Sequence, residues 1–285
     1  MTTLVTGVTG RVGSRFVPRL LDRGEEVRVL VRNADRAAHL SRRGADVVDG
    51  DLRDTDTLKR ITEGVDAVVH LAVVLTAFTR GATDEEAVAV NQTAAVQLAQ
   101  ASLRAGVARF VFASTNLVYG PGRGRPVRED DELRPAEHVY PRSKAAAEEA
   151  LRELQRTDGL GLRTVRLAFV YGEGDPHLAE SLRWAEGWPA HQRLHMIHHA
   201  DAGQALIRAL RAEGVDGRTY NAADDAPVTA VELFDLNDEP VPEGATTRPL
   251  DDPWEGIVDT GRVRAELGFR PIYPTVYTAK EAGAL

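Results

Sequence analysis

The sequence contains no cysteine. This absence excludes disulfide bonds, thiolate metal sites and cysteine nucleophiles. Positive charge is also scarce: 35 Lys and Arg stand against 43 Asp and Glu, a formal net charge of −8. A nucleic-acid partner is therefore not expected, because phosphate contacts need clustered positive charge. Long apolar runs are missing too, since the most apolar stretch, residues 67–75, is far shorter than the roughly 20 residues that span a bilayer.

No secretion signal is expected. The first seven residues, MTTLVTG, are typical of a strand and turn, without the basic region, apolar core and small-residue cleavage site of a signal peptide. We therefore expect a cytoplasmic protein with no membrane association. At 43% hydrophobic and 27% charged residues, the composition is that of a globular protein, and 285 residues correspond to about two domains.

Short apolar runs alternate with longer segments of helical period over the first 170 residues. Six strands are predicted near 3–6, 27–31, 46–48, 67–71, 110–113 and 164–169. Neighbouring parallel strands can be joined only by a crossover, so the pattern predicts a doubly wound α/β fold with a parallel sheet. We assign residues 1–170 to a Rossmann domain and 171–285 to a small substrate-binding lobe. Within that lobe, residues 196–222 are expected to return to the sheet, and the chain from Pro227 onward is expected to be irregular.

A glycine-rich turn joins the first strand to the first helix. In such a unit the first glycine permits a tight turn, the second lets backbone N–H groups approach a pyrophosphate, and the third lets helix and strand pack closely. The alternative is a glycine-rich turn without a ligand. The dinucleotide-binding residues predicted here are Gly7, Thr9, Gly10, Arg11, Val12 and Gly13.

The second strand ends in Val31 and Arg32, where a site that prefers NAD would place Asp or Glu against the adenosine 2′-hydroxyl. Arg32, helped by Arg11 or Arg36, offers a planar fork suited to a 2′-phosphate. The competing interpretation is a solvated loop arginine. We predict NADP(H) as the preferred cofactor and NAD(H) as the alternative.

Several segments, in this order, resemble the extended short-chain dehydrogenase/reductase family, also called the NAD-dependent epimerase/dehydratase family. They are the glycine motif at 6–13, Asp51-Leu52, His70-Leu71-Ala72, the serine/threonine motif at 111–120, Tyr140 to Lys144, the strand at 166–172, and late segments at 198–201, 220–224 and 266–271. The resemblance implies that Asp51 and Leu52 contact the adenine. It also implies that Leu71 and Ala72 lie under the cofactor ribose.

Tyr140 and Lys144 lie four residues apart in a predicted helix and therefore share one face. A phenol titrates near 10, and a neighbouring cation favours its ionised form. The resemblance implies that Tyr140 exchanges a proton with the substrate oxygen, that Lys144 also holds the nicotinamide ribose, and that Thr115 polarises the carbonyl. Asn91 belongs either to a proton or water relay or to the set of buried structural amides.

Departures from the family pattern restrict the substrate. Asn116 and Leu117 follow Thr115 where the sugar-nucleotide dehydratases carry Asp and Glu, so we reject that dehydratase mechanism. Phe169 replaces an Asn that contacts the substrate diphosphate in many nucleotide-sugar enzymes, which favours a small or apolar substrate. Trp184 and Trp188 either line an apolar pocket or pack the lobe. No metal is expected, and the histidines at 191, 195, 198 and 199 are not assigned to a metal site.

These observations predict an NADP(H)-preferring reductase or alcohol dehydrogenase for a small-molecule carbonyl or alcohol substrate. One alternative is a sugar or nucleotide-sugar epimerase or dehydrogenase with tightly bound NAD. Another is a non-enzymatic NADP(H) sensor, against which Tyr140 and Lys144 count. The resemblance also implies a homodimer that pairs the long helices at 85–105 and 140–155.

Overall fold

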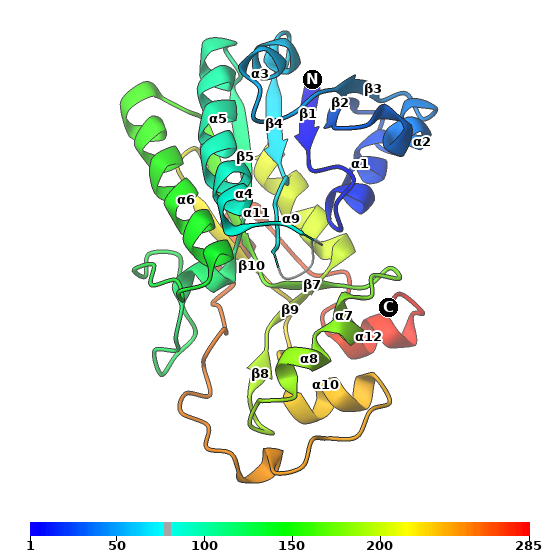
Figure 1. Cartoon of the computed structure of the whole chain (residues 1–285), viewed down its shortest axis with the longest axis vertical. Coiled ribbons are helices and arrows are strands. Elements are labelled where there is room, and N and C mark those ends of the chain that lie inside the picture. Colours follow the sequence, from blue (N-terminus) through cyan, green and yellow to red (C-terminus); the bar gives the residue numbers. More distant parts are fainter. Residues whose placement is uncertain (77–80) are drawn as a thin grey trace.

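A seven-stranded parallel sheet forms the centre of the molecule (Figure 1). The structure is a computed structural model that describes residues 1–76 and 81–285. The strand order is β10-β6-β5-β4-β1-β2-β3. The strands are β1 (Thr2–Thr6), β2 (Glu26–Val31), β3 (Asp46–Asp49), β4 (Ala67–His70), β5 (Arg109–Thr115), β6 (Leu162–Leu167) and β10 (Thr219–Ala222). The predicted doubly wound α/β fold is confirmed.

Both faces of the sheet are covered by helices, which explains why most residues of the central strands β1, β4, β5 and β6 are buried. Along β1, Leu4 packs into the core on one face and Val5 into the core on the other. The Leu4 face is covered by α3 (Thr55–Thr62), α5 (Ala95–Arg104) and α6 (Val139–Asp158). The Val5 face is covered by α1 (Gly13–Leu21) and α9 (His199–Arg211).

The remaining elements of this domain lie between the strands, apart from α11 (Gly261–Leu267), which follows the last strand and packs against β10 and α9. The others are η1 (Ala34–Ala37), α2 (Ala38–Ser41), α4 (Asp84–Val88), η2 (Ala89–Ala94) and η3 (Asn116–Tyr119). The segment predicted as one helix over 85–105 consists of α4, the π-helical turn η2 and α5. Such a π-turn inserts an extra residue and turns the following side chains, and it is frequent at functional sites.

A smaller lobe lies below the carboxyl ends of the strands (Figure 1). It contains two short sheets, in which β7 (Phe169–Tyr171) pairs with β9 (Met196–His198) and β8 (Arg193–Leu194) pairs with β11 (Val228–Thr229). Its helices are α7 (His177–Glu180), α8 (Leu182–Ala185), α10 (Ala230–Leu236), η4 (Ala245–Thr247) and α12 (Val276–Glu281). Between these elements the chain returns to the main domain as α9 and β10, and β10 pairs in parallel with β6.

The prediction of an irregular chain after Pro227 was wrong. Three helices, α10, α11 and α12, lie in this region. Two of them begin with capping boxes, in which Thr229 pairs with Glu232 and Thr275 with Thr278. Helices of six or seven residues are too short to show a clear apolar period, so their caps are the better sequence signal.

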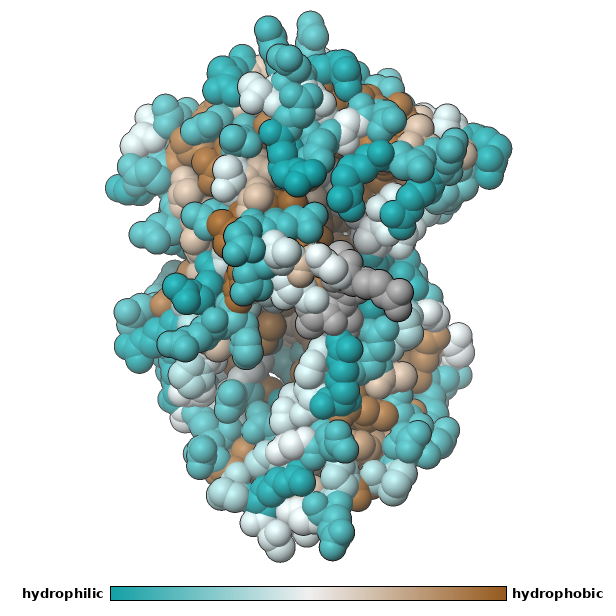
Figure 2. Space-filling model, in the orientation of Figure 1, coloured by the Kyte–Doolittle hydropathy of each residue, from teal (hydrophilic) through white to brown (hydrophobic). Residues whose placement is uncertain are grey.

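Figure 2 shows a largely hydrophilic surface that narrows between the two lobes. Across the described residues, no helix has the length and apolar character needed to cross a membrane.

Candidate active site

The glycine loop after β1 is a tight cradle. Gly7 has a φ of +74°, and a Cβ there would lie 2.5 Å from the backbone N of Ala72. A Cβ on Gly13 would lie 2.2 Å from the carbonyl oxygen of Gly7. Both positions therefore require glycine, as the predicted turn and the close approach of helix to strand demand. The loop leads directly into α1, whose N-terminal N–H groups favour an anion.

A cavity of about 290 Å³ opens beside this loop, between β1, β2 and β4. Of the predicted cofactor contacts, Gly7, Thr9, Gly10, Arg32, Asp51, Leu52, Leu71 and Ala72 line it. Val12 and Gly13 do not line it, and they lie at the start of α1. The cavity and the cradle that a Cβ would fill suit a dinucleotide, with the pyrophosphate at the glycine loop and the adenosine near Arg32 and Asp51.

The charged groups that line this cavity are three arginines and one aspartate: Arg32, Arg36, Arg53 and Asp51. Arg53 donates to both Asp51 oxygens, with N–O distances of 2.9 and 2.6 Å. The Arg53 hydrogen bond is the largest influence on Asp51 and holds the pKa of that carboxyl at about 2. The sequence analysis missed Arg53, although it lies only two residues beyond Asp51. The result is a cavity wall with an excess of positive charge.

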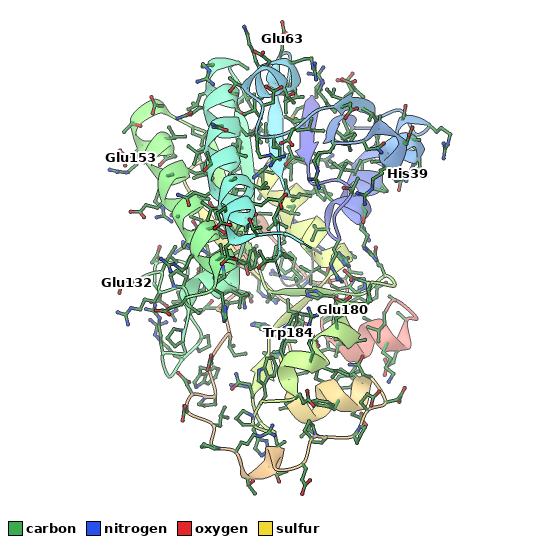
Figure 3. All side chains as sticks on the ribbon, viewed as in Figure 1. His39, Glu63, Glu132, Glu153, Glu180 and Trp184 are labelled. Carbon is green, nitrogen blue, oxygen red and sulfur yellow. The ribbon has the colours of Figure 1, made fainter. Side chains whose placement is uncertain are left out.

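Arg11 does not support Arg32 as predicted. Its guanidinium pairs with Asp175 and, at 2.6 Å, with Glu180 of α7, and Arg11 does not line the cavity. These ion pairs join the glycine loop to the substrate lobe. Figure 3 places Glu180 at the side of this lobe that faces the sheet. The correction could not be foreseen, because Asp175 and Glu180 are more than 160 residues away in the sequence.

Thr115, Tyr140 and Lys144 lie at the carboxyl end of β5 and at the start of α6. Thr115 and Lys144 are buried, whereas Tyr140 is partly exposed. The Thr115 hydroxyl accepts a hydrogen bond from the N–H of Leu117 at 3.3 Å, which fixes it at the start of η3. The Lys144 ammonium lies 3.9 Å from the centroid of the Phe112 ring on β5. Strand and helix thus hold the three side chains that the sequence assigned to catalysis.

The pKa of Tyr140 shifts in the opposite direction to the one predicted. Burial raises the pKa of the Tyr140 phenol above its ordinary value, and hydrogen bonding with the Thr115 side chain opposes that shift. Burial lowers the pKa of Lys144 to about 7, although the Glu148 carboxylate opposes this shift. The expected lowering of the Tyr140 pKa by Lys144 is therefore not seen, because burial dominates both groups. A protonated phenol suits the donation of a proton to a carbonyl oxygen.

Asn91 is fully buried on η2, and its amide is committed to structure. It accepts from the Val74 N–H at 2.7 Å and donates to the Val74 carbonyl at 3.0 Å. It also donates to the Ser143 hydroxyl at 3.2 Å, one residue before Lys144. These contacts join the wall of the cofactor cavity to the catalytic helix. They favour the structural interpretation of Asn91 over the relay.

Aromatic rings gather where β6 leads into the substrate lobe. Phe169 stacks on His177 with ring centroids 4.0 Å apart. Trp184 meets both rings edge-on, with centroids 6.4 Å from Phe169 and 6.1 Å from His177. Figure 3 shows Trp184 beside Glu180 on the side of the lobe that faces the sheet. Trp188 instead packs against the core of the lobe, so the two tryptophans have different surroundings.

Three of the four histidines at 191–199 make separate contacts, and His191 is exposed. His195 accepts from the Val258 N–H and contacts the Asp224 carbonyl, His198 contacts the Ala284 carbonyl, and His199 contacts Asp175. Across the part of the chain that the structure describes, no group of three or more His, Asp or Glu side chains is arranged to hold a metal.

The comparisons with known proteins agree with this geometry. The model of the NAD dependent epimerase/dehydratase family matches residues 3–223. A 4-hydroxy-2-methyl-3-oxo-4-farnesyl-3,4-dihydroquinoline-1-oxide ketoreductase from Stigmatella aurantiaca is 31% identical over 243 residues, which cover 80% of this chain and 70% of that protein.

Two solved structures cover 99% of this chain. A short-chain dehydrogenase/reductase superfamily protein from Agrobacterium tumefaciens with bound NAD has a TM-score of 0.81 and 25% identity, with 96% of its chain covered. A dTDP-glucose 4,6-dehydratase from Streptomyces venezuelae with NAD bound has a TM-score of 0.78 and 28% identity, with 97% covered. The fold and site define a nicotinamide-dependent enzyme of the short-chain dehydrogenase/reductase type. The chain belongs to the NAD dependent epimerase/dehydratase family.

Proposed function

We propose that the protein is an NADP(H)-preferring reductase of an apolar ketone or aldehyde. The observation that carries the proposal is the joint placement of Thr115 at the carboxyl end of β5 with Tyr140 and Lys144 at the start of α6, where the Thr115 and Tyr140 side chains are hydrogen-bonded. The reverse oxidation of the alcohol uses the same groups. The sensor alternative does not account for a buried lysine one helical turn from a partly exposed tyrosine.

The chemistry follows from the protonation of these groups. When bound, a reduced nicotinamide supplies a hydride to the carbonyl carbon. The Tyr140 phenol, whose pKa is raised, donates its proton to the carbonyl oxygen, so that the product is an alcohol. The Thr115 hydroxyl donates a hydrogen bond to the same oxygen, where negative charge develops. Lys144 would hold the cofactor ribose, and its ammonium would return a proton to the Tyr140 phenolate and then take up a proton from solvent.

The preference for NADP(H) is supported by the charge of the cofactor cavity. Three arginines line it, and its one aspartate is already paired with Arg53. Arg32 rather than a carboxylate directly follows β2, so the position that would accept from a 2′-hydroxyl in an NAD site carries a positive charge instead. Arg32 and Arg36 both lie close enough to line the same cavity, and a dianionic phosphate suits this pair.

An apolar substrate is supported by the aromatic rings at the entry to the substrate lobe and by the exposed Leu117 beside Thr115. Phe169, His177 and Trp184 form an aromatic cluster, and Leu117 beside Thr115 has an exposed fraction of 51%. Asn116 donates its amide to the Gly256 carbonyl at 3.0 Å and cannot perform the acid–base work of a dehydratase. The related ketoreductase from Stigmatella aurantiaca is named for a farnesylated quinoline substrate, a large apolar ketone.

The competing function is a sugar epimerase or dehydrogenase that retains NAD, as suggested by the NAD-bound dehydratase of related fold. Fluorescence titration of freshly purified protein with NADPH and NADH separates the two, once retained cofactor has been measured by acid extraction. We expect purified protein that retains no cofactor and that binds NADPH more tightly than NADH. We also expect members of a panel of aryl and isoprenoid ketones to oxidise NADPH in the presence of the protein. Stoichiometric retained NAD would overturn the proposal in favour of the epimerase. The predicted homodimer remains a proposal, which light scattering tests.

A further inference from the structure

Lys144 occupies an unusual environment for a charged side chain. It is 2% exposed, lies over the Phe112 ring and forms no ion pair with any carboxylate in the described ranges. The titratable groups around it are His70 on β4, Tyr140 and Glu148 on α6, and Arg166 on β6 beyond Glu148. His70 is fully buried, and burial lowers its pKa to about 3, so it is neutral. Glu148 is therefore the one anion that favours the Lys144 ammonium.

Glu148 is itself held by a second cation. It lies one helical turn after Lys144 and is 1% exposed. Arg166, also 1% exposed, donates from Nε to Oε1 at 3.0 Å and from Nη2 to Oε2 at 2.5 Å. Both carboxylate oxygens are thus directed at the guanidinium. Arg152, an exposed arginine one turn further along α6, also approaches Oε2, at 3.5 Å. A buried bidentate pair of this kind is costly to desolvate, and it is not needed for the stability of a core.

Arg166 also forms hydrogen bonds on the side of its guanidinium that faces away from Glu148. Its Nη1 donates to the Tyr119 hydroxyl at 2.6 Å and to the Glu129 carbonyl at 3.2 Å. The Tyr119 hydroxyl in turn donates to Asn221 at 2.7 Å. Burial lowers the pKa of Arg166, but the Glu148 carboxylate and Tyr119 outweigh burial, so the net shift is upward and Arg166 stays charged. The Lys144, Glu148 and Arg166 side chains therefore carry two positive charges against one negative charge.

We propose that Glu148 and Arg166 are positioning residues that set the charge of the catalytic Lys144: Glu148 favours its ammonium form, and Arg166 limits that effect by binding both oxygens of the carboxylate. The proposal rests on the proposed function only for its catalytic consequence. The arrangement keeps Lys144 close to the balance between charged and neutral forms at neutral pH. Lys144 can then pass a proton toward Tyr140 in either direction of the reaction.

The sequence allows this charge to be measured directly, because the chain contains only three lysines: Lys59, Lys144 and Lys280. Lys59 and Lys280 are exposed and serve as internal references. Protein labelled with carbon-13 lysine gives three ε-methylene signals, whose chemical shifts follow ionisation of each amine. The signal of Lys144 is assigned by its loss in Lys144→Met. The titration is performed without cofactor or substrate.

Substitutions of Glu148 and Arg166 are expected to shift the titration midpoint of Lys144 in opposite directions. Glu148→Gln removes the anion and lowers the Lys144 titration midpoint by about one pH unit or more. Arg166→Met frees the Glu148 carboxylate and raises the Lys144 midpoint by a similar amount. The reference lysines do not move. Glu149→Gln, an exposed neighbour on the same helix, is the matched control and leaves Lys144 unchanged. An unchanged midpoint in Glu148→Gln, or an equal shift in Glu149→Gln, would overturn the proposal.

Loss of folding is separated from loss of charge by two further steps. Thermal unfolding is measured for each variant, and Glu148→Gln combined with Arg166→Met removes both charges of the buried pair if the single Arg166 variant does not fold. Because this double variant removes one anion and one cation, its Lys144 midpoint is expected to lie between those of Glu148→Gln and Arg166→Met. A midpoint below that of Glu148→Gln would contradict the role assigned to Arg166.

The catalytic consequence is read from the pH profile of kcat/KM for NADPH-dependent reduction of an active ketone from the panel. Its basic limb is expected to move down in Glu148→Gln by the same amount as the Lys144 midpoint. A lower rate without that shift would mean a merely structural role. If no ketone reacts while the lysine midpoints shift as expected, the proposed function fails and the assignment of Glu148 and Arg166 stands.

Discussion

Replacement of Arg32 by alanine is expected to weaken binding of NADPH selectively. Arg32 is exposed at the end of β2 and lines the 290 Å³ cofactor cavity together with Arg36 and Arg53. A charge-assisted hydrogen bond contributes about 1.5–3 kcal/mol, and solvent screening places an exposed arginine at the lower end of that range. Since 1.4 kcal/mol corresponds to a tenfold change, the Kd for NADPH should rise roughly 10- to 30-fold.

The Kd for NADH should change less than about twofold, because NADH has no 2′-phosphate for Arg32 to contact. Fluorescence titrations of wild type and variant with both cofactors give the four constants, and the NADPH preference of wild type should shrink as ionic strength rises. Arg104→Ala, an exposed arginine at the end of α5, is the matched control. An unchanged Kd for NADPH, or equal weakening of both cofactors, would refute the assignment of Arg32.

Substitutions at three further positions test other parts of the account. Gly13→Ala should lower the melting temperature by several degrees or prevent folding, because its Cβ would lie 2.2 Å from the Gly7 carbonyl oxygen; an unchanged melting curve would contradict the tight cradle. Thr115→Val should reduce kcat about 100-fold and leave the Kd for NADPH unchanged, whereas Thr115→Ser, which keeps the hydroxyl, should retain most of the wild-type rate. An unchanged kcat in Thr115→Val would show that the hydroxyl does not polarise the carbonyl. Burial raises the pKa of Asp224 from 3.8 to about 8, so the folded protein keeps a proton that the unfolded chain releases, and stability falls as pH rises across that window. Asp224→Asn should flatten this slope and stabilise the protein more at pH 8 than at pH 4 in urea unfolding; a parallel slope in both proteins would show that Asp224 ionises normally.

Local patterns were enough to predict the sheet and the tight turn of the glycine loop. The strand predicted near 67–71 is β4, Ala67–His70, and the strand predicted near 110–113 lies within β5, Arg109–Thr115. Gly7 and Gly13 were assigned their roles from spacing alone, and the contacts of a Cβ at each position support those roles. Such features depend on residues that are close in the sequence, where spacing determines geometry.

Features that join distant segments could not be predicted. Arg11 was assigned to the cofactor because its neighbours are cofactor residues, but its charge is paired with Asp175 and Glu180 across the gap between the lobes. The direction in which the Tyr140 pKa shifts was predicted wrongly for a similar reason. Burial by surrounding elements raises this pKa and outweighs the effect of one neighbouring lysine. Sequence spacing gives the partners on one helix face and not the depth at which that face is buried.

The central claim is that Tyr140 transfers a proton in a nicotinamide-dependent carbonyl reduction. The most direct test is the rate of NADPH oxidation with an active ketone, measured for wild type and Tyr140→Phe together with the Kd for NADPH of each. The account predicts a Kd within about twofold of wild type and a kcat lower by at least about 100-fold in the variant, since only the hydroxyl is removed. Full activity of Tyr140→Phe with unchanged NADPH binding would contradict it.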